Sequence, residues 1–445
     1  MKNLTCSTIA QVTGAARGLL PEGELTAVVT DSRNVTSGCL FAAIPGERVD
    51  GHDYIAAAQK SGAACALCEK PADCSLPQLI VPSTEAAIRQ IAAYYRRQFD
   101  IPFIGVTGSV GKTTAKEMIA SVLSQQFNTL KTNKNYNNEL GVPMTLFRLR
   151  ENHEAAVVEM GISGFGEMTR LTEMVRPDTA VFTLIGDAHL EFLGSRKGVL
   201  RAKAEIVGGM RPDGVVICNG DDPLLKEYEF QRRTILFGMD EGCDVRAVNV
   251  TNDGAAGMRC DIVAGRRRFS VTIPAFGQHM VYAALMGAAV GLNYGLTDKQ
   301  IRQGIAAYEP IGGRSNILKT GFITLIDDCY NSNPTSAKSA VLSMSVLPGR
   351  KVCILGDMLE LGEDGPALHR DLGAYAASKG ACVIACGPLA KEIRDGAGDG
   401  AIWFASVSEL LEALPKLIQA GDVVLVKASR RMKFEQISEK LKELL

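Results

Sequence analysis

The sequence has no apolar run long enough to cross a membrane, which takes about 18 consecutive apolar residues. Residues 1–18 also lack the long apolar stretch of a secretory signal, so we expect a cytoplasmic chain. An excess of positive charge is missing too, since the formal net charge is -1 and the sequence pI is about 6.6. A nucleic-acid-binding domain would show a basic patch, so we expect no nucleic-acid partner, whereas small anionic ligands suit this composition.

A zinc-binding pattern is also missing among the 12 cysteines. Cys65 and Cys68 have C-x-x-C spacing, but no second pair follows at a suitable distance. The alanines around them favour a buried strand over a metal or redox site. In the cytoplasm the cysteines are expected to be reduced and to pack as small apolar side chains.

Repeats and low-complexity tracts are absent, so the 445 residues are expected to form about three globular domains. After residue 98, continuous apolar strand patterns are each followed by a helical pattern, which is typical of a doubly wound sheet. The segment 308–317 contains Pro310 and glycines and predicts a hinge, beyond which the alternation restarts. We therefore predict an α/β protein with a small α/β domain, a central mostly parallel domain and a Rossmann-like domain, over residues 1–98, 99–311 and 312–445.

The strongest local signal is the segment 103–123, FIGVTGSVGKTTAKEMIASVL, in which a strand pattern meets a glycine-rich turn and then a helical pattern. Glycines let backbone N–H groups approach a phosphate, and the helix N-terminus adds partial positive charge. Lys112 is expected to reach the β and γ phosphates of a nucleotide, and the Thr113 hydroxyl to bind Mg²⁺. The spacing T-G-x-x-G-K-T-T differs from the common P-loop pattern, because Val106 stands where a leading glycine is usual.

Other polar residues follow later strands. Glu159 ends a buried strand and needs a cation, which Mg²⁺ bound between Thr113 and phosphates would supply; a salt bridge or helix cap is the alternative. His189 follows a strand on the same edge, where both a packing role and a ligand role are open. Lys203 lies on a helical pattern, and as a cation it would repel Mg²⁺, so a solvated surface lysine is its alternative.

Longer motifs point to one family. The chain resembles the Mur ligases, the ATP-dependent amide-forming enzymes of peptidoglycan precursor synthesis. The motifs that carry the resemblance are TGSVGKTT, NKNYNNELGVP, VVEMGISGFGEM, HLEFLGS with RAKAEI, NGDDP, GGRSN, DDCYNSNP and GDMLELGE. They are spread over all three predicted domains, so the resemblance covers nearly the whole chain.

Two members of this family share the N-terminal pattern found here at residues 30–54. One adds the third peptide residue and usually carries an Asp-Asn-Pro-Arg motif, which is absent. The segment 327–334, DDCYNSNP, resembles the other member, which adds D-alanyl-D-alanine. The resemblance implies that a monomer uses ATP to join D-alanyl-D-alanine to UDP-N-acetylmuramoyl-tripeptide through an acyl phosphate, in cell wall biogenesis that supports cell shape and division.

The resemblance also implies roles for individual residues. The catalytic residues it implies are Lys112, His189 and Lys203. The nucleotide-binding residues are Gly108, Ser109, Val110, Gly111, Lys112, Thr113, Thr114, Asn138, Arg314 and Asp328. The residues that bind the other substrates are Ser32, Arg33, Asn135, Tyr136, Asn331, Lys427 and Ser429. Two Mg²⁺ ions would be held by Thr113, Glu159, His189 and Lys203, the last carbamylated by CO₂ and so converted into an anion.

The resemblance assigns the UDP end of the substrate to the first domain, ATP to the second and the dipeptide to the third, which closes over ATP. Two departures from the family stand out. Met280 and Ala283 replace asparagines that usually face adenine, so a hydrophobic contact from Met280 is expected instead. Ala428 replaces a glycine in VKASR and would be strained if the backbone there needs a positive φ.

Two other functions stay open. A sibling ligase would add an amino acid to a uridine-nucleotide or folate-type acceptor. A P-loop nucleotide switch without ligase chemistry would need Asn-Lys-x-Asp to read guanine, and the chain has only TNKN at residues 132–135.

Overall fold

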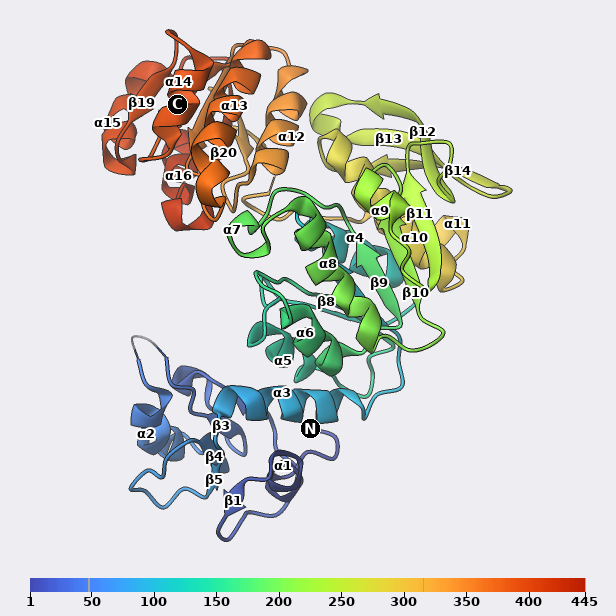
Figure 1. The fold of residues 1–445 in the computed structure, drawn as a ribbon, viewed down its shortest axis with the longest axis vertical. Coiled ribbons are helices and arrows are strands. Elements are labelled where there is room, and N and C mark those ends of the chain that lie inside the picture. Colours follow the sequence, from blue (N-terminus) through green and yellow to red (C-terminus); the bar gives the residue numbers. More distant parts are fainter. Residues whose placement is uncertain (47–48, 315, 445) are drawn as a thin grey trace.

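The computed structural model describes residues 1–46, 49–314 and 316–444, so Ser315 of the GGRSN motif lies outside the described residues. Within these ranges the chain forms three sheets, of five, nine and six strands. Figure 1 shows the three α/β domains following one another along the long axis, with the N-terminal domain at one end and the C-terminal domain at the other. The predicted fold class is confirmed. No helix in the described part of the chain is long and apolar enough to cross a membrane.

The N-terminal domain is built on the smallest sheet. Its strands, in spatial order, are β1 (Ala16–Arg17), β5 (Gln78–Ile80), β4 (Cys65–Cys68), β3 (Leu40–Ala42) and β2 (Val28–Val29). Its helices are α1 (Cys6–Thr13), α2 (Ile55–Lys60) and α3 (Thr84–Arg96). Cys65 and Cys68 are fully buried in β4, which confirms that their spacing belongs to a strand.

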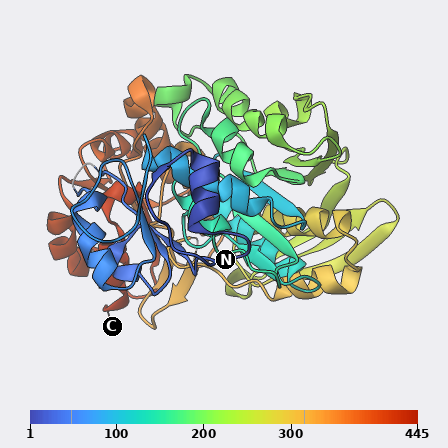
Figure 2. The same cartoon turned by 90° about the horizontal axis from the view of Figure 1, so that it is seen from below.

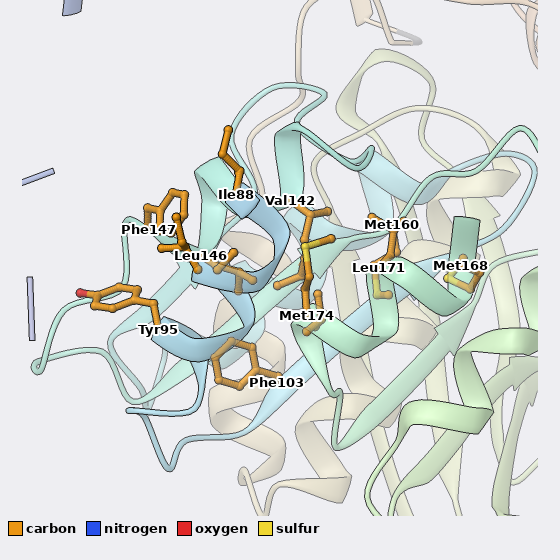
Figure 3. Close-up of a cluster of buried hydrophobic side chains, with 14 of the residues drawn as sticks. Ile88, Tyr95, Phe103, Val142, Leu146, Phe147, Met160, Met168, Leu171 and Met174 are labelled. Atoms are coloured by element: carbon orange, nitrogen blue, oxygen red, sulfur yellow. The ribbon is translucent and has the colours of Figure 1, made fainter. Parts of the chain in front are cut away.

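Helix α3 connects this domain with the next. Ser83 caps it by accepting a hydrogen bond from the Ala86 N–H. Figure 3 shows Ile88 and Tyr95 of this helix packed with Leu146 and Met174 of the central domain. The helix is therefore part of a core that continues from the first domain into the second.

The central domain contains the longest sheet. Its order is β14 (Arg267–Ile273), β13 (Met258–Ala264), β12 (Val245–Asn252), β11 (Arg233–Gly238), β10 (Val215–Asn219), β9 (Thr179–Phe182), β6 (Phe103–Thr107), β8 (Ala155–Glu159) and β7 (Thr129–Lys131). From β7 to β12 the strands are parallel, and β13 and β14 add an antiparallel hairpin. Strands β6, β8, β9 and β10 are buried along their whole length, as their unbroken apolar sequences predict.

Helices cover both faces of the central sheet. They are α4 (Lys112–Leu123), α5 (Gly141–Leu146), α6 (Glu167–Val175), α7 (Leu190–Leu193), α8 (Arg196–Ala204), α9 (Pro223–Glu227), α10 (Gln278–Asn293) and α11 (Asp298–Ala306). Helix α10 lies close against α4, because a side chain at Gly287 or Gly291 would meet Val122. This packing holds α4, and hence the glycine-rich turn before it, firmly against the sheet.

The C-terminal domain is a second α/β unit. Its sheet has the order β15 (Asn316–Lys319), β16 (Thr324–Asp327), β20 (Val423–Lys427), β17 (Lys351–Gly356), β18 (Cys382–Cys386) and β19 (Ile402–Phe404), and only β15 runs antiparallel to its neighbour among the described residues. Its helices are α12 (Pro334–Ser345), α13 (Gly365–Ser378), α14 (Ala390–Ala397), α15 (Val407–Leu417) and α16 (Glu435–Lys442). In Figure 2, seen from below, the N-terminal domain, in blue, lies in front of the C-terminal domain, in orange and red.

Candidate active site

The glycine-rich turn between β6 and α4 wraps around the start of the helix. Gly108 has φ 143°, and a Cβ there would lie 1.9 Å from Thr183 Oγ1. Thr183 Oγ1 donates a hydrogen bond to Val110 O at 2.5 Å, and Lys112 Nζ donates one to Gly108 O at 2.8 Å. Gly111, with φ 82°, is the residue before the first turn of α4, whose N–H groups have no partner within the helix. The turn therefore forms a compact cradle for an anion.

Glu159 lies at the foot of this cradle and is 1% exposed. Thr113 Oγ1 donates a hydrogen bond to its Oε1 at 3.1 Å, and Asn137 Nδ2 donates another at 2.7 Å. Its second oxygen, Oε2, is shielded from solvent and makes no hydrogen bond with any described residue. A buried carboxylate oxygen without a hydrogen bond is costly unless a cation lies beside it, and the nearest ammonium, that of Lys116, is 4.0 Å away, too far for a hydrogen bond. The residues present therefore fit a Mg²⁺ ion held by Thr113 and Glu159.

His189 precedes α7 and has φ 55°, in the left-handed region. Its Nδ1 lies 2.6 Å from Glu360 Oε2 of the C-terminal domain, but the two atoms are not aligned as a hydrogen bond, and Nδ1 has no other partner among the described residues. Burial lowers the pKa of His189, and the nearby Lys112 and Lys203 lower it further, whereas Glu360 raises it. A neutral imidazole is the form that binds a metal ion, so His189 also fits a cation site.

Lys203, on α8, is 1% exposed, so the interpretation as a solvated surface lysine is wrong. Its ammonium makes no hydrogen bond or ion pair within the described residues. Burial, and then the charge of Lys112, hold the pKa of Lys203 well below its usual range, and Glu167 only partly opposes them. A buried amine that loses its proton easily is more nucleophilic than a solvated one at neutral pH.

A cavity of about 700 Å³ opens beside α4, between the central domain and the segment that leads to the C-terminal domain. Thr113 and Asn135 line one side, and Arg314, Tyr330 and Arg430 line the other. The Arg314 guanidinium lies 4.2 Å from the centre of the Tyr330 ring. The electrostatic influence of Arg314 reaches Lys112, whose pKa burial and Arg314 lower and Glu159 raises. Three predicted site residues therefore share one cavity.

A second group of predicted residues gathers at the strand ends of the C-terminal domain. Lys427, 2% exposed, donates hydrogen bonds to Asp328 Oδ2 at 2.6 Å and to Asn331 O at 2.9 Å. Ser429 Oγ accepts a hydrogen bond from the Leu359 N–H at 2.9 Å. Ala428 is not among the residues with positive φ, so the strain considered from its sequence is absent.

Some predicted residues have other partners or lie elsewhere. Arg33, on the N-terminal domain, forms an ion pair with Asp31 at 2.6 Å and is remote in sequence and domain from the glycine-rich turn, as is Ser32. Asn138 uses its Oδ1 to accept a hydrogen bond from the Gly141 N–H at 2.8 Å. The exposed Tyr136 lies nearby on the same loop.

Met280, from which a hydrophobic contact with adenine is expected, lies on α10. Met280 is 3% exposed and Ala283 is 1% exposed, and both pack into the apolar core between α10 and the sheet. The contact of Met280 with a base stays a prediction.

Sequence reasoning missed three residues of this site. Asn137 lies in the asparagine-rich motif NKNYNNELGVP, from which only its neighbours Asn135, Tyr136 and Asn138 were predicted as site residues. Lys116 lies one helical turn after Lys112, and this spacing is the signal that places both on one side of α4. Glu360 contacts His189 only because two domains pack together, and no local sequence pattern predicts that contact.

The fold and the site together define a P-loop nucleotide-dependent enzyme built from three α/β domains, with its phosphate cradle facing the C-terminal domain. The chain belongs to the Mur ligase family. Residues 24–109 match the family's catalytic domain, residues 106–291 the Mur ligase middle domain, and residues 313–430 the Mur ligase, glutamate ligase domain.

Individual relatives agree over nearly the full chain. The UDP-N-acetylmuramoyl-tripeptide–D-alanyl-D-alanine ligase of Bacillus subtilis is 35% identical and covers 98% of both chains. A crystal structure of MurF from Acinetobacter baumannii matches with a TM-score of 0.94 and 34% identity over 99% of both chains. The MurF ligase of Thermotoga maritima in complex with ADP matches with a TM-score of 0.85 and 29% identity, over 94% of this chain and 97% of that one.

Proposed function

We propose that this chain joins D-alanyl-D-alanine to UDP-N-acetylmuramoyl-tripeptide and releases ADP and phosphate. It is an ATP-dependent peptide ligase of peptidoglycan precursor synthesis. The observation that carries the proposal is the phosphate cradle with the buried Glu159 at its foot, in a chain that is similar over its whole length to ligases with this activity. A sibling ligase and a nucleotide switch are less well supported, because the full-length relatives carry the name of the D-alanyl-D-alanine-adding enzyme.

The chemistry requires activation of an acid group. A carboxylate is a poor electrophile, because its leaving group would be oxide. The terminal carboxylate of the tripeptide therefore attacks the γ-phosphate of ATP, and ADP leaves. The amine of the dipeptide then attacks the carbonyl carbon of the acyl phosphate, and phosphate leaves as the amide forms. Lys112 and the N–H groups of the turn hold the phosphates in place and offset the repulsion between the two anions.

The cation site completes this assignment. Thr113 and Glu159 would hold one Mg²⁺ and His189 a second, with Lys203 carbamylated by CO₂ so that an anion stands where a free lysine would repel metal. Bound Mg²⁺ supplies positive charge that stabilises the transferring phosphoryl group. The buried Glu159 Oε2 and the lowered pKa of Lys203 support this arrangement.

Each domain binds a different part of the substrates, and the domain boundaries lie near residues 98 and 311. Ser32 and Arg33 contact the uridine-nucleotide end, and Asn135 and Tyr136 line its path to the central domain. The nucleotide extends from the turn, Gly108 to Thr114, toward Asn138, Arg314 and Asp328. Asn331, Lys427 and Ser429 receive the dipeptide. Gly313, with φ 73°, allows the C-terminal domain to close and exclude water from the acyl phosphate.

We further propose that the protein acts as a cytoplasmic monomer and supports cell shape and division.

The test is phosphate release by the purified protein with ATP, Mg²⁺, UDP-N-acetylmuramoyl-tripeptide and D-alanyl-D-alanine. Release that requires both substrates, with the amide product seen by mass spectrometry, is the expected result. Release with single amino acids in place of the dipeptide indicates a sibling ligase, and release without any acceptor indicates a nucleotide switch. Tripeptides that end in lysine or in diaminopimelate, tested side by side, identify the acceptor.

A further inference from the structure

Glu360 of the C-terminal domain and His189 of the central domain meet across the interface between these domains. Glu360 Oε2 lies 2.6 Å from His189 Nδ1. Both residues have positive φ, 64° for Glu360 and 55° for His189. A side-chain-bearing residue in the left-handed region costs about 1–2 kcal/mol and persists where its surroundings fix it. Two such residues in direct contact point to a constrained feature rather than a chance approach.

The loop that carries Glu360 is fixed from within its own domain. The Met358 N–H donates a hydrogen bond to His369 Nε2 at 2.9 Å, and His369 Nδ1 lies 2.6 Å from Gly365 O. The next N–H, of Leu359, donates to Ser429 Oγ at 2.9 Å. His369 is completely buried, so the imidazole acts as an internal support. The two residues that precede Glu360 are therefore held by buried side chains.

A second contact joins the same two domains. Thr335 Oγ1, at the start of α12, donates a hydrogen bond to Asp187 Oδ2, two residues before His189, at 3.1 Å. A Cβ at Gly362 would lie 3.5 Å from the Glu191 backbone, so the two surfaces also pack closely. The approach of Glu360 to His189 thus belongs to an extended contact between the domains.

The contact places a carboxylate directly beside the imidazole of His189. The Glu360 carboxylate lies beside Nδ1, which leaves the other ring nitrogen, Nε2, as the one that can bind a cation. A carboxylate beside an imidazole commonly fixes the orientation of the ring toward a metal ion, and its loss typically weakens the metal site.

We infer that Glu360 is a positioning residue that orients His189 for the cation site and so links docking of the C-terminal domain to cation binding. This inference rests on the proposed function, because it takes His189 as a cation ligand. The carboxylate acts through the imidazole and touches no substrate. When the C-terminal domain moves away, the carboxylate moves with it, and His189 loses its orientation.

The test uses the full chain with Glu360→Gln, Glu360→Asp and the control Glu363→Gln, which changes an exposed carboxylate three residues further on. Mn²⁺ binding is measured by electron paramagnetic resonance in the presence of a non-hydrolysable ATP analogue, so the readout needs no turnover. Glu360→Gln is expected to weaken Mn²⁺ binding about tenfold, as removal of such supporting groups typically does. Glu360→Asp is expected to recover part of this loss, and Glu363→Gln to match the wild type.

Steady-state kinetics and a second substitution add independent readouts. The apparent KM for Mg²⁺ should rise in Glu360→Gln, with little change in the KM for ATP. In a His189→Gln background, Glu360→Gln should have no further effect on Mn²⁺ binding. Unchanged or tighter Mn²⁺ binding in Glu360→Gln would overturn the inference, as would an undiminished effect in the His189→Gln background. Failure of the proposed function is seen separately, as wild-type protein that releases no phosphate with its two substrates.

Discussion

Lys116 Nζ lies 4.0 Å from Glu159 Oε2, and both side chains are buried, Lys116 completely. The same ammonium donates a hydrogen bond to Thr132 O at 2.8 Å and lies 2.8 Å from Glu117 Oε1. Thr132 Oγ1 in turn accepts a hydrogen bond from the Glu159 N–H at 3.0 Å. Lys116 therefore partly compensates the negative charge of the Glu159 carboxylate. Both residues also bond to Thr132, Lys116 to its carbonyl and the Glu159 N–H to its hydroxyl.

Replacing Lys116 with Met should destabilise the central domain, because the buried Glu159 then loses its nearest positive charge. Removal of one partner of a buried ion pair typically costs about 3–5 kcal/mol, and this change should fall near the lower end. The free energy of unfolding in urea measures the loss. The matched control is Lys131→Met, which removes a half-exposed partner of Glu117 and should cost less than about 1 kcal/mol. Equal losses in the two variants would mean that burial of Lys116 adds nothing.

Gly108→Ala should damage nucleotide binding, because the added Cβ would lie 1.9 Å from Thr183 Oγ1 and φ is 143°. The turn must shift to relieve this overlap, and a displacement of about 1 Å near the reacting groups can cost about a hundredfold in rate. Binding of a non-hydrolysable ATP analogue by calorimetry, together with phosphate release, measures the effect.

Gly265→Ala provides the control for backbone strain alone. Gly265 has φ 58° in the hairpin between β13 and β14, and an added Cβ meets nothing within 4 Å. This change should lower stability by about 1–2 kcal/mol and leave nucleotide affinity unchanged. Normal affinity in Gly108→Ala would show that the turn does not bind the phosphates in the way proposed.

The parts of this site that could be predicted from the sequence are those built from neighbouring residues. The turn after β6 depends on glycines and a lysine within a few positions of one another, so its shape is encoded locally. The same holds for Ser83, which caps α3 through the N–H of Ala86 three residues later. The apolar strands of the central sheet are likewise read from continuous segments.

Burial and contacts between distant segments could not be predicted in this way. Lys203 looks like a surface residue on an amphipathic helix, and only the packing of α8 against the cradle buries it. Met280, expected near a base from the motif, is buried in the core beside α10, which no local pattern indicates. Such outcomes depend on tertiary packing, which is not encoded in a local pattern.

Lys203→Ala should abolish most ligase activity, with a loss on the order of a hundredfold or more, because it would remove the carbamate anion that we propose organises the reacting groups. Short carboxylates such as formate or acetate should restore part of the activity by occupying the space of the carbamate. The rate of phosphate release, with and without added carboxylate, measures both effects. Lys197→Ala, which changes an exposed lysine on the same helix, should behave as wild type. Full activity of Lys203→Ala without any additive would remove Lys203 from the mechanism.

Acid should weaken the C-terminal domain through His369, because burial lowers the pKa of this imidazole in the folded protein. The unfolded chain then takes up a proton at higher pH than the folded one, so the stability that His369 contributes is complete above the unfolded pKa of about 6.5 and is lost as pH falls below it. Protonation would also break the hydrogen bond that His369 Nε2 accepts from the Met358 N–H. The contribution of this one group to the slope is at most about 1.4 kcal/mol per pH unit.

Trp403 offers a direct readout, since it is the one tryptophan in the sequence and lies in β19 of the C-terminal domain. Urea unfolding followed by its fluorescence should give a free energy that falls from pH 7 to pH 5 in the wild type. In His369→Gln the side-chain amide can still accept and donate hydrogen bonds but does not titrate, so the fall should be shallower. The other buried histidine among the described residues, His52, lies in the N-terminal domain, so the difference between the two proteins isolates His369. Parallel pH profiles would show that His369 takes up its proton at the same pH in the folded and the unfolded chain, so that burial does not lower its pKa.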